Sequence, residues 1–112
     1  MHLSTLTEFD FHPRLASSAG VSLVLFTAPH CGSCRVWTRL LQDITTPLIQ
    51  HIYSVDVQIA TALAREYDVF HLPSLFIFVD GKFHAPLQAQ AQHNAVIKAL
   101  QHALNTPAHD EP

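Results

Sequence analysis

Residues 21–34 read Val-Ser-Leu-Val-Leu-Phe-Thr-Ala-Pro-His-Cys-Gly-Ser-Cys, an apolar run that leads into the only two cysteines of the chain. The segment from Leu23 to Phe26 is apolar at every position, which is typical of a central strand covered on both faces. After Cys34, apolar residues recur at helical spacing. The sequence therefore predicts a strand, a tight turn and a helix, with Cys31 at the start of the helix.

Cys31 stands where a thiol becomes reactive. A helix N-terminus offers unpaired N–H groups and the positive end of the helix dipole, and both favour the thiolate over the thiol. Lowering a thiol pKa from about 8.5 to about 7 takes about 2 kcal/mol, which these two effects together can supply. Cys31 is therefore the candidate nucleophile. Cys34, one helical turn further in, would be shielded and could attack a mixed disulfide formed at Cys31, so the pair is typical of a redox couple.

Apolar spacing also indicates the elements that follow. Val36, Leu40 and Ile44 recur every four residues, which predicts a helix from about Cys34 to Ile44 with this face buried. The next strand is expected within residues 49–57.

A second amphipathic helix is predicted by Ile59, Leu63 and Tyr67, again with these apolar residues on the buried face. A C-terminal helix is expected from about residue 96 to 104. Near the start of the chain we expect a short strand, followed by an irregular or short helical stretch that Pro13 interrupts.

The last two strands form a hairpin in this interpretation. Leu75–Val79 is a second continuous apolar strand, and Asp80-Gly81 is a strong turn signal into residues 82–85. Pro86 confines the second of these strands to a sheet edge, because proline cannot donate to a strand ladder. The predicted fold class is α/β, with a central mixed sheet of four to five strands and helices on both faces.

Composition fits one domain, which we place at residues 1–106, followed by a flexible polar tail at 107–112. Six basic and nine acidic side chains give a net charge of −3 without a basic run, so no nucleic-acid or anionic-membrane partner is expected.

The chain start shows no leader-like pattern and no segment has the length of a membrane span, which leads us to expect a cytoplasmic location. The nine histidines are scattered, and exposed positions are the default for them.

Two stretches resemble the thioredoxin family. The first runs from Phe26 to Cys34 and is similar to that family's approach of aromatic and small residues to Cys-Gly-Pro-Cys. The second begins with Leu72-Pro73-Ser74 and resembles the family's Ile-Pro-Thr, which also precedes an apolar strand and a glycine turn. The resemblance covers about Val21 to Leu104 and implies the thioredoxin fold.

For function, the resemblance implies a thiol–disulfide oxidoreductase acting on protein substrates. Cys31 matches the exposed nucleophile and Cys34 the resolving thiol, with Gly32 between them supporting the site. Pro73 matches the cis-proline that packs against the active-site disulfide. Leu72 matches the residue whose backbone pairs with an extended substrate segment, so binding would rest on main-chain hydrogen bonds.

No phosphate-binding loop or dinucleotide fingerprint is present, so we expect no cofactor and no metal. Electrons would have to come from a partner, which the resemblance implies to be a reductase or another dithiol. We expect the chain to be a monomer.

Several residues depart from the family pattern. Leu25 occupies the position of a buried aspartate that helps deprotonate the resolving thiol. His30 replaces a tryptophan. As imidazolium it would favour the Cys31 thiolate, and as imidazole it could take a proton during exchange; an exposed residue without a role is an equally open interpretation. Ser33 replaces the proline of the motif, from which we expect a reduction potential different from that of thioredoxin. Arg39 replaces the proline that kinks the helix.

Three alternatives stay open at this point. The cysteines could be incidental packed thiols, or they could form a zinc or copper site completed by histidines such as His30 or His71. The third alternative is a redox-weak binding or scaffold module that docks partners near Pro73, which the missing acid at Leu25 favours.

Overall fold

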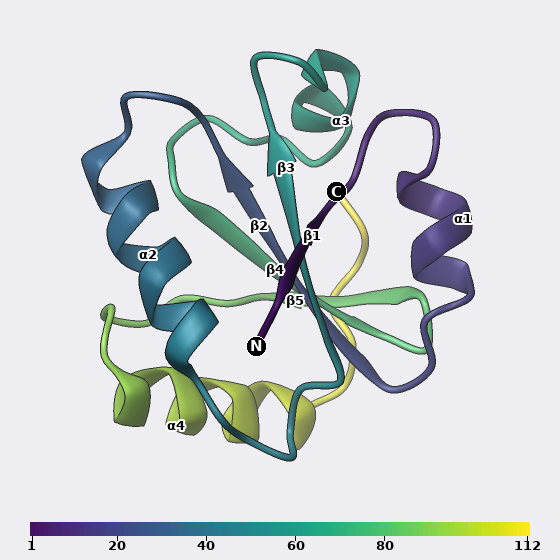
Figure 1. Ribbon diagram of the computed structural model, residues 1–112. Helices are drawn as coiled ribbons and strands as arrows, with labels where there is room; N and C mark the ends of the chain where they lie inside the picture. The colour runs from purple at the N-terminus through teal and green to yellow at the C-terminus, as the bar shows by residue number, and fades with distance from the viewer.

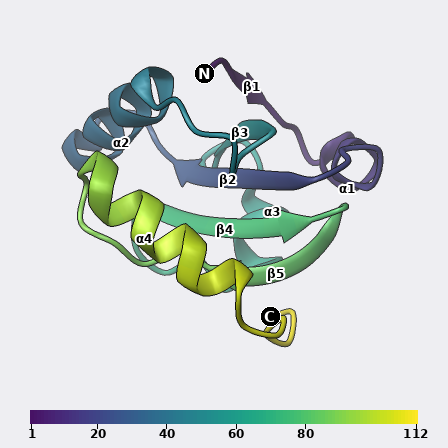
Figure 2. The same cartoon turned by 90° about the horizontal axis from the view of Figure 1, so that it is seen from below.

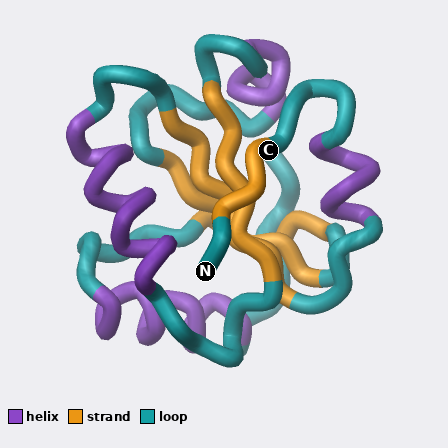
Figure 3. The backbone as a smooth tube through the Cα atoms, viewed as in Figure 1, coloured by secondary structure: helices purple, strands orange, loops and turns teal.

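The computed structural model describes residues 1–112 and shows a β-α-β-α-β-α-β-β-α chain (Figures 1 and 3), which confirms the predicted order of elements. Each element lies close to its predicted range. The elements are β1 (Leu3–Thr5), α1 (Phe11–Ala16), β2 (Val21–Thr27), α2 (Gly32–Asp43), β3 (His51–Asp56), α3 (Thr61–Glu66), β4 (Ser74–Val79), β5 (Lys82–Pro86) and α4 (His93–Leu104).

The strands form one five-stranded sheet in the order β1-β3-β2-β4-β5. β3 is parallel to both β1 and β2, whereas β4 runs antiparallel to β2 and β5 antiparallel to β4. The predicted mixed α/β sheet is therefore confirmed. β5 is an edge strand, as Pro86 at its end predicts.

One face of the sheet is covered by α2 and α4, which lie on the same side in Figure 2. Leu23 and Leu25 of β2 point to this face, where they pack in one cluster with Trp37 of α2 and Leu100 of α4. β2 is buried on both sides because alternate residues of a strand point to opposite faces.

The other face of the sheet carries α1 and α3 and holds an aromatic cluster. Val24 and Phe26 of β2 point to this side. Rings from α1, from β2, from Tyr67 at the end of α3 and from the hairpin meet there with centroid separations of 5.4–6.3 Å, a normal spacing for aromatic pairs. The rings are those of Phe11, Phe26, Tyr67, Phe76, Phe78 and Phe83.

Two predicted core residues are exposed, so that part of the helix prediction is wrong. Val36 is 56% exposed because α2 buries the neighbouring stripe of Cys34, Trp37 and Leu41 instead. Ile59 is 76% exposed because it lies in the turn before α3, where helical spacing does not apply.

Pro13 does not interrupt the first helix. It is the third residue of α1, and the first four N–H groups of a helix have no partner within it, so the missing donor costs no hydrogen bond there. At the other end of the chain, residues 107–112 form no helix or strand. This tail turns back towards β5 (Figure 2), where the N–H of His109 donates to the carbonyl of His84 at 2.6 Å. No helix of the fold combines the length and hydropathy needed to cross a bilayer.

Candidate active site

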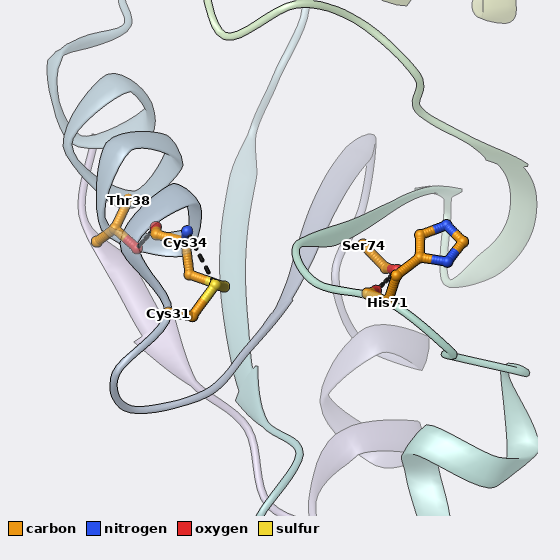
Figure 4. Close-up of a disulfide and its surroundings, with 5 residues drawn as sticks. All are labelled: Cys31, Cys34, Thr38, His71 and Ser74. Atoms are coloured by element: carbon orange, nitrogen blue, oxygen red, sulfur yellow. Dashed lines mark hydrogen bonds between the residues drawn. A yellow bond between two sulfur atoms is a disulfide. The ribbon is translucent and has the colours of Figure 1, made fainter.

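Cys31 is the residue that caps α2. Its backbone is extended (φ −98°, ψ 106°), and the helix starts at Gly32. The N–H of Cys34 donates a hydrogen bond of 3.2 Å to Cys31 Sγ (Figure 4). The sulfur thus takes the place that a serine or aspartate oxygen occupies in ordinary helix caps, and this donor favours negative charge on the sulfur.

Cys31 and Cys34 are joined in a disulfide whose Cα atoms lie 5.2 Å apart. The two cysteines differ in accessibility: Cys34 is 1% exposed, whereas Cys31 is partly exposed. An incoming thiol can therefore reach Cys31 but not Cys34. This asymmetry is what a nucleophile and a resolving thiol require.

Thr38 belongs to this site although sequence reasoning did not single it out. Its Oγ1 donates a 2.8 Å hydrogen bond to the carbonyl of Cys34 (Figure 4). The four-residue spacing from Cys34 was the available signal, because a threonine hydroxyl can bond the carbonyl one turn back. The bond holds the helical turn that carries the Cys34 sulfur.

The loop before β4 lies at the same end of the sheet as the cysteines. β2 and β4 are paired with Phe26 opposite Ser74, so the loop that follows β2 and the loop that precedes β4 emerge side by side. The Leu72–Pro73 peptide bond is cis, in agreement with the resemblance. Within the loop, Ser74 Oγ donates to the carbonyl of His71 at 2.7 Å (Figure 4).

The histidines do not gather around the sulfurs. The His71 ring points away from the disulfide in Figure 4. His30 is exposed and has a left-handed backbone (φ 64°). This conformation is unfavourable in free energy for any residue other than glycine. No group of three or more His, Cys, Asp or Glu side chains is placed to hold a metal ion, so the cysteine pair has no further ligands around it.

Gly32 and Ser33 form the exposed start of α2. A Cβ added to Gly32 would meet no atom within 4 Å, so the surface next to Cys31 is open on this side.

An apolar side chain stands free beside the loop before β4. Phe70 is 86% exposed and lines one surface pocket with Pro73 and Ser74, and a second with Val57 and Leu72. Sequence reasoning did not identify Phe70. Its signal was an aromatic residue directly before the loop and outside any predicted helix or strand.

Leu25 is fully buried in the apolar cluster beneath α2. The position that resembles the family's buried aspartate is thus occupied by an ordinary core residue. Deprotonation of Cys34 cannot rely on a carboxylate there.

Comparisons with known proteins agree with this geometry. The thioredoxin family model matches residues 2–102. A thioredoxin of Staphylococcus aureus is 31% identical over 84 residues, which is 73% of this chain and 79% of that protein. Protein disulfide-isomerase 2-3 of Arabidopsis thaliana is 30% identical over 92 residues, 80% of this chain, and the chain spans only 20% of the length of that relative.

Proposed function

The chain belongs to the thioredoxin family, and we propose that it is a thiol–disulfide oxidoreductase that acts on protein substrates through Cys31 and Cys34. One observation carries the proposal. A reachable sulfur caps the N-terminus of α2 and is bonded to a buried sulfur one turn further along. Such a pair can accept or donate two electrons without a cofactor.

In the reducing direction the reaction has two displacements. The Cys31 thiolate attacks one sulfur of a substrate disulfide, so a mixed disulfide forms and the other substrate sulfur leaves as a thiolate. The Cys34 thiolate then attacks Cys31 Sγ, which forms the Cys31–Cys34 disulfide and releases the second substrate thiolate. Two electrons pass from the chain to the substrate.

The oxidised chain needs an external reductant before it can act again. We assign this step to a reductase or a small dithiol, which transfers two electrons to the Cys31–Cys34 disulfide. Dependence on such a reductant makes a reducing compartment such as the cytoplasm the setting we propose. We propose a monomer as the working form.

Substrate docking is assigned to the loop before β4. Leu72 is partly exposed beside Pro73, and we assign its backbone to main-chain pairing with an extended segment. The exposed ring of Phe70 and the two pockets that it lines lie next to this loop and offer apolar contact.

The test compares the wild type with Cys31→Ser and Cys34→Ser in a protein-disulfide reduction assay, in which a chemical dithiol serves as the reductant. We expect turnover by the wild type and none by Cys31→Ser. Cys34→Ser, reduced beforehand and mixed with the substrate after the dithiol has been removed, should accumulate a mixed disulfide that a gel without reductant detects. Turnover that survives Cys31→Ser, or a wild type that binds partners without turnover, would contradict the proposal and favour the scaffold alternative.

A further inference from the structure

A surface hollow lies beside Cys31, on the outer face of the first two turns of α2. It is lined by Gly32, Arg35, Val36 and Arg39. These residues are spaced by three and four positions, so they share one face of the helix. All four are exposed, which leaves the face free to meet a partner.

Arg35 and Arg39 have no acidic partner within the chain. The only ion pairs join His12 to Glu66 and Arg14 to Asp10. α2 has no acidic residue in its first turn, and its only carboxylate is Asp43, which lies one turn beyond Arg39 and forms no ion pair with it. The hollow is therefore locally positive, although the whole chain has a net charge of −3.

We infer that Arg35 and Arg39 make the enzyme select protein segments that carry Asp or Glu beside the reacting cysteine. The inference rests on the proposed function and specifies its substrate class. A substrate sulfur bonded to Cys31 Sγ lies at the N-terminal end of α2, so one side of the substrate chain can run along the hollow.

The geometry of the hollow suits such a segment. Gly32 leaves the path from Cys31 to the arginines open, since a Cβ there would meet nothing. Val36, 56% exposed between the two arginines, offers apolar contact to the stem of a Glu side chain. Each guanidinium can hold a carboxylate by two parallel hydrogen bonds, which a lysine cannot do.

Charge complementarity also favours an encounter in which the acidic substrate meets the face of the enzyme beside Cys31. A net negative chain repels an acidic partner on average, and a local positive face beside the disulfide therefore orients the encounter towards the reactive sulfur. Exposed ion pairs contribute modestly, and two of them change a rate by about 2- to 30-fold.

The test uses three peptides with the same disulfide, flanked by Glu, by Gln or by Lys. We expect kcat/KM of the wild type to fall in the order Glu, Gln, Lys, with about 2- to 30-fold between the extremes at low salt and less at high salt. The double variant Arg35→Ala/Arg39→Ala should bring this ratio close to one. Lys82→Ala/Lys98→Ala, which removes the same charge from exposed sites on β5 and α4, should keep the wild-type ratio.

The ratio between peptides is the deciding quantity, because it cancels any effect of Arg35→Ala on the thiols themselves. The inference would be overturned by equal kcat/KM for the three peptides, or by a preference for the Glu peptide that persists in the double variant. In either case, turnover of the Gln peptide would still support the proposed oxidoreductase function. Absence of turnover with all three peptides would overturn the proposed function and the inference together.

Discussion

The hydroxyl of Tyr67 donates a hydrogen bond of 2.9 Å to Oε1 of Glu111, across 44 positions of the sequence. Tyr67 is 2% exposed, and its ring packs within the aromatic cluster on the α1 and α3 face. The bond fastens the C-terminal tail to the core. Burial, and then the bond to the Glu111 carboxylate, raise the pKa of the Tyr67 hydroxyl well above its usual range.

Tyr67→Phe is expected to make the fold less sensitive to alkaline pH. In the wild type, the unfolded chain ionises this hydroxyl near pH 10 and the folded chain does not. The stabilisation is therefore complete below about pH 10 and is lost above it, by up to about 1.4 kcal/mol per pH unit. Tyr67→Phe removes this loss, at a cost of about 1 kcal/mol at neutral pH for the missing hydrogen bond. Urea unfolding at several pH values measures both.

Glu111→Gln is the matched control for this prediction. It keeps an acceptor for Tyr67 and removes only the charge, and burial is the larger cause of the raised pKa. The alkaline loss should therefore persist in this variant. If the free energy of unfolding of Glu111→Gln depended on pH as that of Tyr67→Phe does, the charge of Glu111, and not burial, would control the loss of stability at alkaline pH.

The sheet and the placement of the cysteines could be predicted from local sequence alone. Leu23–Phe26 and Leu75–Val79 are continuous apolar runs, which are typical of strands covered on both faces. Pro86 cannot donate to a ladder, and β5 accordingly lies at the edge. These are physical requirements of short segments, which do not depend on distant partners.

Features that depend on distant partners could not be predicted. The exposure of Val36 follows from which side of α2 meets the sheet, and periodicity reports only that one side does. Likewise, the contacts of His109 with His84 and of Glu111 with Tyr67 join a polar tail to residues more than 20 positions away. No local pattern encodes such contacts.

Two glycine substitutions should have opposite effects on stability. Gly81 has a φ of +80°, and a Cβ there would lie 2.6 Å from the carbonyl oxygen of Leu15 and 2.7 Å from Cα of Ala16. We expect Gly81→Ala to lower the free energy of unfolding by about 1–3 kcal/mol or more.

Gly32→Ala is the matched comparison, because a Cβ at Gly32 meets nothing and alanine is favoured over glycine within a helix by about 0.5–1 kcal/mol. Its stability should equal or exceed that of the wild type. Thermal unfolding of the two variants tests the pair, and a destabilised Gly32→Ala or an unaffected Gly81→Ala would contradict the geometry.

Ser22→Ala is expected to leave stability unchanged or to raise it by about 1 kcal/mol. Ser22 is fully buried in β2, and its Oγ has no hydrogen-bond partner. An unpaired buried hydroxyl costs free energy that alanine does not incur. Urea unfolding measures the change. Ser18→Ala is the contrasting variant, because Ser18 Oγ is bonded to Tyr53 and to the carbonyl of Arg14, and it should lose about 1 kcal/mol or more.

Replacement of His30 should slow the reaction of Cys31 in mildly acidic solution. An imidazolium beside a sulfur at the start of a helix stabilises the thiolate by about 1 kcal/mol near a surface. The substitution to use is His30→Asn, because asparagine tolerates the left-handed backbone at this position (φ 64°). We expect alkylation of the reduced protein by iodoacetamide to be about fivefold slower than in the wild type at about pH 5.5.

Added salt separates this effect from a general disturbance of the site, because salt screens a charge at the surface. The difference between His30→Asn and the wild type should shrink as the salt concentration rises. His71→Asn is the control, since the His71 ring is turned away from the disulfide and its loss should not change the alkylation rate. Equal rates for His30→Asn and the wild type at about pH 5.5 would contradict the idea that the charge of His30 favours the Cys31 thiolate, because only that charge is expected to change the thiolate fraction that iodoacetamide reports.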